Sequence, residues 1–327
     1  MSAKRIVVTG EIPAATQRLS ELCAVYPWPE SCALTDTHFE RVTIGGLELF
    51  MVGLVGTASG KPSVIAAAAE AGGYPVDRAF FELLERQSMH LARSKEREYP
   101  LDPDPERVRA SLSSGVALHR SWAEACVSAT CELIERDRVQ RSFRGDFAPV
   151  ALTLADGRLA RDLDALYSLE ADSCHPPDAD TKLVHAVAGF FLFPRANHHP
   201  ISYGFAGARN LSEALSSARG EALQRLAFLW GEPLPSVSPE PAPVPDYHQE
   251  YYLYAPHHEV LRGWLAGGRR SVDVGARCVF DGEDVAFVDL TPETLRGKVA
   301  VAKARSPHAC ALRFGAPGKD AVPHPIC

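Results

Sequence analysis

The chain has 327 residues, of which 46% are hydrophobic and 23% charged, and its formal net charge is −7. This is an ordinary globular composition, long enough for a large core or for two lobes. Basic residues are spread out rather than clustered, so we expect no nucleic-acid partner. The apolar runs fall far short of the roughly 20 residues that a membrane-spanning helix needs, and the first residues do not have the pattern of a signal peptide. We therefore expect a cytoplasmic protein with no membrane partner.

The eight cysteines form no CxxC pair. In a reducing compartment we expect them to be free thiols. The doublets His198-His199 and His257-His258 do not predict a zinc site, because adjacent side chains point in different directions.

In chain order, the spacing of apolar and turn-forming residues predicts a mixture of helices and strands. The first part is expected to contain a strand over 4–9, a β-hairpin over 41–55 with its turn at Gly45-Gly46, and a helix over 77–93. The clearest predicted helix covers 121–140, with Ser121 as its N-cap and Glu124 as the capping-box partner.

The rest of the chain continues this mixed order without a regular βαβ repeat. It is expected to contain a strand over 150–154, a strand over 183–193 that is buried on both faces, a helix over 212–230 ended by Gly231, short strands over 271–274, 278–280, 285–289 and 299–304, and an irregular tail over 317–327. Residues 232–246 hold six prolines, which predicts an extended connector rather than a helix or a central strand.

One motif of charged residues occurs twice in the chain and has the residue types of a metal-binding site. Glu-x-x-Glu-Arg occurs at 82–86 and again at 132–136, each time on a predicted helix. Spacing of three places both carboxylates of a pair on one helical face, where like charges repel unless a cation lies between them. Magnesium prefers oxygen ligands and keeps coordination sites for phosphates, and arginine binds phosphate bidentately. The repeat therefore indicates a site for a magnesium–nucleotide complex.

A single motif of this kind is common on solvated helix faces. The second copy has apolar neighbours, namely Cys131, Leu133 and Ile134, which predict burial, and a buried carboxylate needs a partner or a metal. If both copies were chance occurrences in an unrelated protein, the glutamates would lie exposed to solvent.

Two further patterns accompany the repeat. Gly115, next to Ser114, can adopt positive φ and let backbone amides approach a ligand. Residues 57–63 (TASGKPS) superficially resemble a phosphate loop but do not match GxxxxGK[ST], so a turn is the expected structure there.

Four segments resemble the YcaO family. Residues 113–138 (SSGVALHRSWAEACVSATCELIERDR) resemble its second glutamate motif, and 79–88 (AFFELLERQS) resemble its first. Residues 204–226 resemble a later helix of the family in which Glu and Gln precede Arg, and 289–307 resemble its C-terminal strand. The likeness begins after the first 50 or so residues.

This resemblance implies an α+β fold in which antiparallel sheets are flanked by helices that carry the paired motifs. It implies an N-terminal strand-rich segment over 1–55 and an ATP-binding catalytic domain over 56–327, with the connector 232–246 inside it. ATP and Mg²⁺ are the implied cofactors. The implied metal ligands are Glu82, Glu85, Glu132 and Glu135. The implied cofactor-binding residues are Ser114, Gly115, Arg136, Glu221, Gln224, Arg225 and Lys303.

The end of the chain is part of the resemblance. Many azoline-forming members end in Pro-x-Pro-x-Pro, and this chain ends Pro323-His-Pro325-Ile-Cys327. The resemblance implies that the terminal carboxylate acts as a base near the phosphates, which makes Pro325 and Cys327 the catalytic candidates.

The implied activity is ATP-dependent phosphorylation of backbone amides in a ribosomally made precursor peptide, followed by cyclodehydration of Cys, Ser or Thr to thiazoline or oxazoline. Thioamide formation, macroamidine formation and a non-catalytic YcaO-like scaffold subunit stay open as alternatives. The first 50 or so residues are too few for a leader-binding domain, so we expect a leader-binding partner protein. A homodimer also stays open.

Overall fold

The computed structural model describes residues 13–58, 61–95, 109–110, 114–154, 157–175, 183–267, 280–315 and 322–326. The strands expected over 4–9 and 271–274, and most of the one over 278–280, lie outside these residues. The chain divides into two compact units. The first comprises Met1–Tyr99, Gly115–Thr130 and Ala286–Arg305; the second comprises Pro100–Ser114, Cys131–Val285 and Ser306–Cys327.

The first unit contains two antiparallel three-stranded sheets, with strand orders β1-β2-β3 and β10-β11-β5. Its strands are β1 (Ala33–Ile44), β2 (Leu47–Ala58), β3 (Lys61–Glu70), β5 (Val116–His119), β10 (Ala286–Asp289) and β11 (Ala300–Arg305). Its helices are α1 (Pro13–Val25), α2 (Val76–Lys95) and the first turns of α3 (Trp122–Arg144). The predicted hairpin is confirmed, and Gly45 at its turn has φ 60°.

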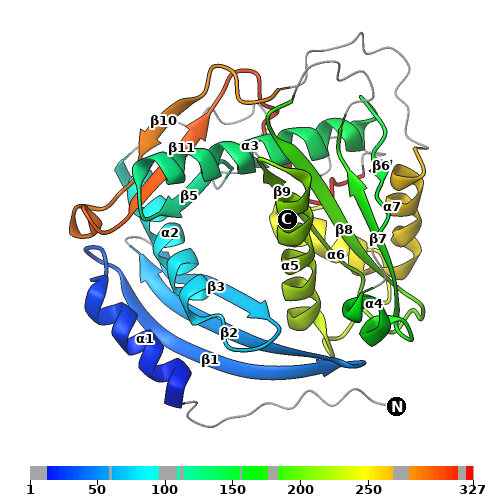
Figure 1. Cartoon of the computed structure of the whole chain (residues 1–327), viewed down its shortest axis with the longest axis horizontal. Helices are drawn as coiled ribbons and strands as arrows, with labels where there is room; N and C mark the ends of the chain where they lie inside the picture. Colours follow the sequence, from blue (N-terminus) through cyan, green and yellow to red (C-terminus); the bar gives the residue numbers. More distant parts are fainter. Residues whose placement is uncertain are drawn as a thin grey trace. The chain divides into compact units, whose positions relative to one another are not determined.

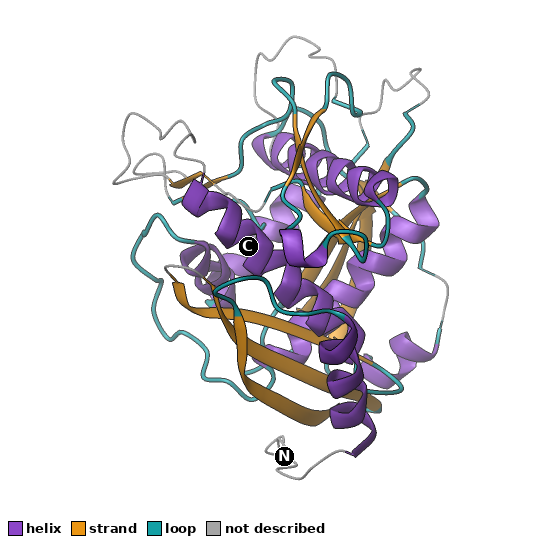
Figure 2. Cartoon of the chain, turned by 90° about the vertical axis from the view of Figure 1, so that its left-hand side faces the viewer, coloured by secondary structure: helices purple, strands orange, loops and turns teal. Residues whose placement is uncertain are grey.

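Helices α1 and α2 share one hydrophobic core with β2 and β3. Leu19 of α1, Leu54 of β2 and Leu83 of α2 are buried in it, and Figure 2 shows the curved strands of this unit with their helices. The alanine-rich strand β3 was not predicted, because alanine has a low strand propensity. It forms because it pairs with β2 along its length, and Val64, Ala66 and Ala68 alternate into the core.

The second unit contains a four-stranded antiparallel sheet of order β6-β7-β8-β9. Its strands are β6 (Val150–Ala151), β7 (Tyr167–Ser173), β8 (Ala186–Pro194) and β9 (Ser202–Ala208), and a small pair joins β4 (Arg109–Ala110) to β12 (Arg313–Phe314). Its helices are the rest of α3, α4 (Arg158–Leu163), α5 (Leu211–Leu229), α6 (Pro245–Leu253) and α7 (His258–Leu265). The mixed α+β fold with antiparallel sheets is thereby confirmed.

Strand β8 is buried on both faces, as its apolar sequence predicts. Helix α5 lies along β8 and β9 (Figure 1), and its contact face is made of small residues, Ala214, Ala218 and Ala222, which let the helix approach closely. The opposite face of β8 contacts the aromatic ring of Trp264 through Phe191.

The long helix α3 begins where the sequence predicts. Ser121 donates from its hydroxyl to the Glu124 carboxylate at 2.8 Å and accepts from the Glu124 backbone N–H at 3.3 Å. The helix continues to Arg144, beyond the predicted end. The proline-rich connector has no helix or strand until Pro245 opens α6, a position where the missing N–H of proline costs nothing.

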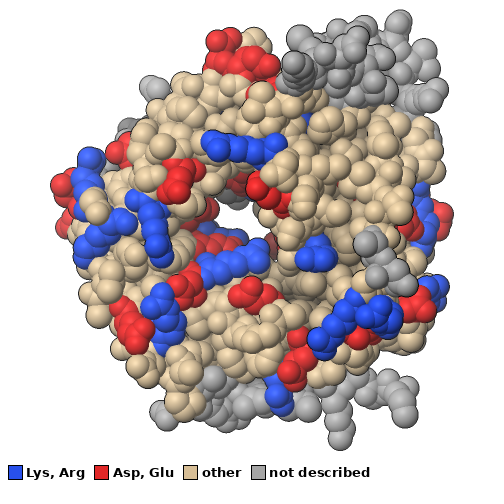
Figure 3. All heavy atoms as spheres, viewed as in Figure 1, with Lys and Arg blue, Asp and Glu red and all other residues tan. Residues whose placement is uncertain are grey.

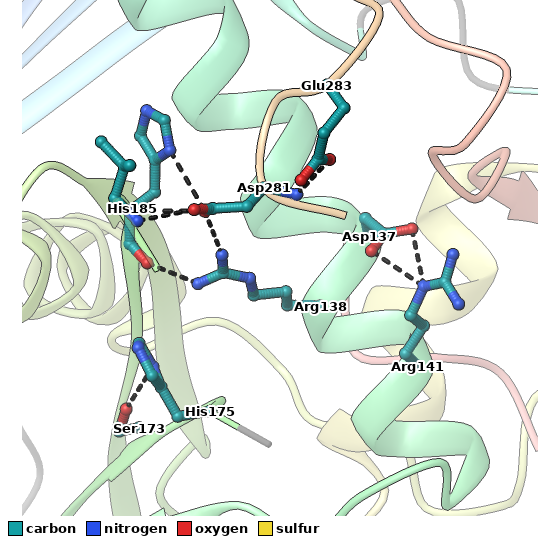
Figure 4. A network of polar contacts seen from close by, with 9 residues as sticks. Asp137, Arg138, Arg141, Ser173, His175, His185, Asp281 and Glu283 are labelled. Carbon is teal, nitrogen blue, oxygen red and sulfur yellow. Dashed lines mark hydrogen bonds and ion pairs between the residues drawn. The ribbon is translucent and has the colours of Figure 1, made fainter. Parts of the chain in front are cut away.

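Directly after the second Glu-x-x-Glu-Arg motif in sequence, α3 carries a buried ion-pair network (Figure 4). Arg138 pairs with Asp281 and donates to the His185 carbonyl at 2.6 Å. Asp281 also accepts from the backbone N–H of Val184 at 2.6 Å. The residue that precedes Arg138, Asp137, accepts from Arg141, one turn further along α3, at 2.9 Å and from the Cys310 N–H at 2.7 Å. These residues tie α3 to three segments that are distant in sequence.

The described residues contain no helix that is long and apolar enough to cross a membrane. On the face drawn in Figure 3, acidic and basic side chains lie interspersed, and the basic ones do not gather into one patch.

Replacing Arg138 should destabilise the second unit. The side chain of Arg138 is fully buried, so Arg138→Leu would leave the Asp281 carboxylate buried without its cation, which costs about 3–5 kcal/mol. The measurement is the free energy of unfolding in urea. Arg158→Ala is the control, because this exposed arginine pairs with Asp162 on the surface and its loss should cost less than about 1 kcal/mol. Equal effects of the two substitutions would contradict a structural role for the buried pair.

Candidate functional site

In the second unit, the site starts from the second Glu-x-x-Glu-Arg motif on α3. Arg136 contacts Glu132 one turn earlier, with 2.6 Å between Nη2 and Oε1, and donates from Nη1 to the Ser114 hydroxyl at 3.0 Å. The Arg136 side chain is only 13% exposed. The structure therefore brings together three of the predicted site residues, and it fixes the guanidinium at two points.

The other carboxylates of this unit meet at β9, the edge strand of the four-stranded sheet. Glu221, from α5, accepts a hydrogen bond from the backbone N–H of Phe205 at 3.1 Å. Glu135, from α3, accepts one from the backbone N–H of Gly207. Two helices thus each place a carboxylate on the outer edge of the same strand, two residues apart.

The electrostatics of this pair favour a cation. Burial raises the pKa of Glu135 well above the usual value for glutamate, and the negative charge of Glu221 raises it further, against the lowering effect of Arg136. Two carboxylates in such surroundings repel each other, and a divalent cation removes the repulsion. The donor atoms are all carboxylate oxygens, the type that Mg²⁺ prefers.

The carboxylates come in pairs rather than as a closed cage. Within the part of the chain that the structure describes, no three His, Cys, Asp or Glu side chains converge in a way that could hold a metal ion by themselves. Mg²⁺ commonly takes one or two carboxylates and completes its octahedron with phosphate oxygens and water. The donor set therefore fits magnesium that arrives with a nucleotide.

Gln224 and Arg225 continue the site along α5. The side-chain oxygen of Gln224 is buried and has no hydrogen-bond partner among the described residues. Buried polar atoms in native proteins nearly always have a partner, so this oxygen fits a donor that a ligand brings. The guanidinium of Arg225 lies over the Tyr203 ring, 4.0 Å from its centroid, which holds it by a cation–π contact.

The first unit repeats the same arrangement with the first motif, on α2. Glu82 accepts from the backbone N–H of Ala67, on the edge strand β3, and from Arg86 at 2.5 Å. Arg86 donates its other nitrogen to the Ile65 carbonyl of β3 at 2.8 Å. Burial raises the pKa of Glu82, and Arg86 partly counteracts that shift.

Glu85 points to a second edge strand. It accepts from the backbone N–H of Leu118 in β5 at 2.8 Å. The loop before β5 contains Gly115, which has the positive φ expected of it, 68°, and whose carbonyl accepts from the Ala304 N–H at 2.7 Å. Lys303 lies opposite Val116 in the register and is 4% exposed. The first unit thus gathers Glu85, Gly115 and Lys303 around β5.

All four predicted metal ligands are half-buried, which is not what chance motifs on solvated helices would show. The 57–63 segment lies at the hairpin between β2 and β3, where Ala58 pairs with Lys61; residues 59–60 lie outside the described residues. The expectation of a turn there therefore remains untested at those two positions.

The C-terminal segment is held in the second unit by α6. The Tyr252 hydroxyl donates to the Pro323 carbonyl at 2.5 Å. His248 donates from Nδ1 to the His324 carbonyl at 2.9 Å and accepts at Nε2 from the Gly315 N–H at 2.9 Å. One donating and one accepting nitrogen define a neutral imidazole.

Pro325 is buried in this segment, and Cys327 lies outside the described residues. The catalytic assignments of Pro325 and Cys327 therefore stay predictions. No sequence signal pointed to His248 or Tyr252, because a single histidine or tyrosine on a short helix has no diagnostic pattern.

Comparisons with known proteins identify the family and the fold. A family model described as YcaO cyclodehydratase, ATP- and Mg²⁺-binding, matches residues 96–310. No curated protein sequence matches the chain. The fold is similar to that of YcaO from Methanopyrus kandleri bound with AMPPCP and Mg²⁺, at 15% identity and a TM-score of 0.53 over 98% of this chain and 100% of that one. It is also similar to a chain of the E. coli microcin synthetase McbBCD complex, at 13% identity and a TM-score of 0.50 over 86% and 88% of the two chains. At such identities, the structural likeness establishes the fold.

The stability of the folded chain should fall as the pH drops below about 6.5, in part through His248. Burial lowers the pKa of His248 to about 4, whereas an imidazole in an unfolded chain titrates near 6.5. Because the folded pKa is the lower one, the contribution of His248 is complete above the unfolded pKa. It is lost as the pH falls through the window between the two values, at about 1.4 kcal/mol per pH unit.

The matched variant is His248→Asn, which keeps a donor near Nδ1 and removes the titrating ring. Urea unfolding measured across that pH window should give a plot of free energy against pH whose slope is smaller in the variant by about 1.4 kcal/mol per pH unit. Parallel plots for the two proteins would show that His248 is not held neutral in the fold.

Proposed function

The chain belongs to the YcaO family of ATP- and Mg²⁺-binding cyclodehydratases, and from that premise we propose that it phosphorylates backbone amides of a ribosomally made peptide and converts Cys, Ser or Thr to thiazoline or oxazoline. ATP and Mg²⁺ are the cofactors of this enzyme family. The observation that carries the proposal is the convergence of Glu135 and Glu221 on the edge of β9, beside the Arg136–Ser114 pair. A cytoplasmic location is part of the proposal.

Each candidate site residue has a distinct role in the proposed reaction. Glu132 and Glu135 would hold Mg²⁺ in the second unit, and Glu82 and Glu85 have the corresponding assignment in the first. Arg136, held by Glu132 and Ser114, offers its guanidinium to phosphate oxygens. Glu221, predicted as a cofactor-binding residue, would share the cation with Glu135, and Gln224 and Arg225 would orient the nucleotide from α5. Gly115, with its positive φ in the loop before β5, and Lys303 are the remaining candidates for contact with the phosphates.

The chemistry asked of these residues is positioning and charge neutralisation. ATP with its Mg²⁺ supplies the phosphoryl group that turns the amide oxygen into a leaving group. In the proposed reaction the side chain of a substrate Cys, Ser or Thr would lose its proton and attack the carbon of the preceding amide, whose oxygen would be phosphorylated by ATP and leave as phosphate. The amide nitrogen would then lose its proton and form the C=N bond of the ring. The peptide loses one water per ring. The chain itself contributes fixed carboxylates, a fixed guanidinium and partial exclusion of water by burial.

A peptide substrate and a partner protein are the finer part of the proposal. The fold is similar to that of the McbBCD synthetase complex with pro-MccB17 bound, at 12% identity and a TM-score of 0.50. We propose that this chain likewise acts on a precursor peptide that a leader-binding partner delivers. Thioamide or macroamidine formation would use the same activation with a different nucleophile.

Glu135→Gln should weaken the binding of Mg²⁺–ATP without destabilising the fold. Glutamine keeps an oxygen for the Gly207 N–H and removes one of the two repelling charges. The cation therefore loses a charged ligand, and the protein without cation loses the repulsion between the two carboxylates. We expect Mg²⁺–ATP affinity to fall on the order of 100-fold and the melting temperature of the free protein to stay equal or rise. Calorimetric titration and thermal unfolding measure the two effects.

Glu213→Gln is the control for that experiment, because Glu213 is exposed in the first turn of α5, the helix that carries Glu221. It should bind Mg²⁺–ATP as the wild type does. Unchanged affinity in Glu135→Gln would remove the carboxylate site from the proposal.

Incubating the chain with ATP, a candidate precursor peptide and its partner protein tests the reaction. Mass spectrometry should find the loss of one water per modified residue, together with ADP and phosphate in equal amounts. A gain of sulfur in place of oxygen would identify a thioamide-forming enzyme. If the wild type binds no Mg²⁺–ATP with or without peptide and partner, the chain is a scaffold subunit and the proposed activity is wrong.

A further inference from the structure

Strand β9 is an edge strand, so alternate backbone N–H groups along it point away from the sheet. Two of these outward groups, on Phe205 and Gly207, donate to the carboxylates of Glu221 and Glu135. Donors two residues apart on one strand edge lie about 7 Å apart. The strand therefore fixes one end of each carboxylate at a defined interval, although the carboxylates come from different helices.

Two glycines let both helices reach this edge. A Cβ atom at Gly204 would lie 2.4 Å from the Ala218 carbonyl oxygen and 2.6 Å from the Ala222 nitrogen of α5. A Cβ at Gly207 would lie 2.3 Å from the Cys131 carbonyl oxygen of α3 and 3.3 Å from the Cβ of Glu135. Real Cβ atoms do not approach backbone atoms so closely. A side chain at Gly204 would therefore displace α5, and one at Gly207 would displace α3.

The two glycines face opposite sides of the sheet, because they are an odd number of residues apart. Helix α5 thus packs directly on one face of β9 at Gly204, and α3 packs directly on the other face at Gly207. The glutamate side chains are short, and only this close approach from both sides brings them to the edge donors. The backbone of β9 and the glycines act on the same two carboxylates.

We propose that the outer edge of β9 is the template that sets the spacing of the Glu135 and Glu221 carboxylates for the divalent cation of the nucleotide, with Gly204 and Gly207 as positioning residues. The inference rests on the proposed function, since it concerns the geometry of the same Mg²⁺–ATP site. Mg²⁺ demands nearly ideal octahedral coordination, whereas Ca²⁺ accepts longer and less regular bonds. A template that fixes carboxylate spacing therefore selects for magnesium.

Gly207→Ala tests this inference. The added methyl group should push α3 away from β9 and change the carboxylate spacing. We expect the Mg²⁺ concentration needed for half-maximal ATP binding to rise about 10- to 100-fold, the range found when groups that orient metal ligands are lost. With Ca²⁺ the change should be much smaller, so the preference for Mg²⁺ over Ca²⁺ falls. Gly204→Ala should act in the same direction through α5.

Two further variants separate this role from a merely structural one. Gly263→Ala on α7 adds a methyl group where nothing lies within 4 Å, and it should leave both cation midpoints unchanged. Replacing Phe205 by the matching α-hydroxy acid converts its amide to an ester, which removes the N–H and keeps the side chain. It should raise the Mg²⁺ midpoint about 10-fold while thermal unfolding still shows a folded chain.

The outcomes are distinct. If the wild type binds Mg²⁺–ATP and the glycine and ester variants lose affinity for Mg²⁺ more than for Ca²⁺, the template is supported. If the wild type binds but the folded variants keep its Mg²⁺ and Ca²⁺ midpoints, or lose affinity for both cations by the same factor, the template is wrong and the proposed function stands. If the wild type binds no Mg²⁺–ATP, the proposed function fails and the inference with it.

Discussion

A glutamate carboxylate that accepts a hydrogen bond from the outward backbone N–H of an edge strand occurs in both units. Glu82 binds to β3 and Glu85 to β5 in the first, and Glu135 and Glu221 bind to β9 in the second. A backbone donor in a sheet cannot rotate away as a side chain can, so each carboxylate is held before any ligand arrives. Such preorganisation is the main means by which a protein stabilises developing charge.

The rest of the second unit supports that contact. Strand β9 stays in place because β8 is buried on both faces, between the small residues of α5 and the aromatic rings that meet Trp264. Helix α3 stays in place because Asp137 and Arg138, directly after the second Glu-x-x-Glu-Arg motif, tie it to distant loops. The residues proposed to bind the ligand and those that anchor the helix are thus consecutive in sequence.

The sequence predicted the elements whose own side chains determine them. Helices α2, α3 and α5 have clear apolar spacing or caps, and the first hairpin has a glycine turn. Strands β3 and β9 were not predicted because alanine and glycine dominate them, and their conformation depends on neighbours that are distant in sequence. The same dependence explains the site. Glu135 was predicted from its motif and Glu221 from the family resemblance, whereas the N–H groups of Phe205 and Gly207 resemble those of every other residue until the strand is at a sheet edge.

The carboxylates on β3, β5 and β9 also affect how the protein behaves among its own copies. An uncovered strand edge is a template on which another chain can add a strand, and charged groups at the edge prevent this. Here the charged groups at the strand edges are the glutamate carboxylates that we assign to cation binding. By the proposed assignment, a chain that lost these glutamates to small or apolar side chains would lose cation binding and gain open edges together. Selection for solubility would then help to retain the site even when demand for its chemistry is weak.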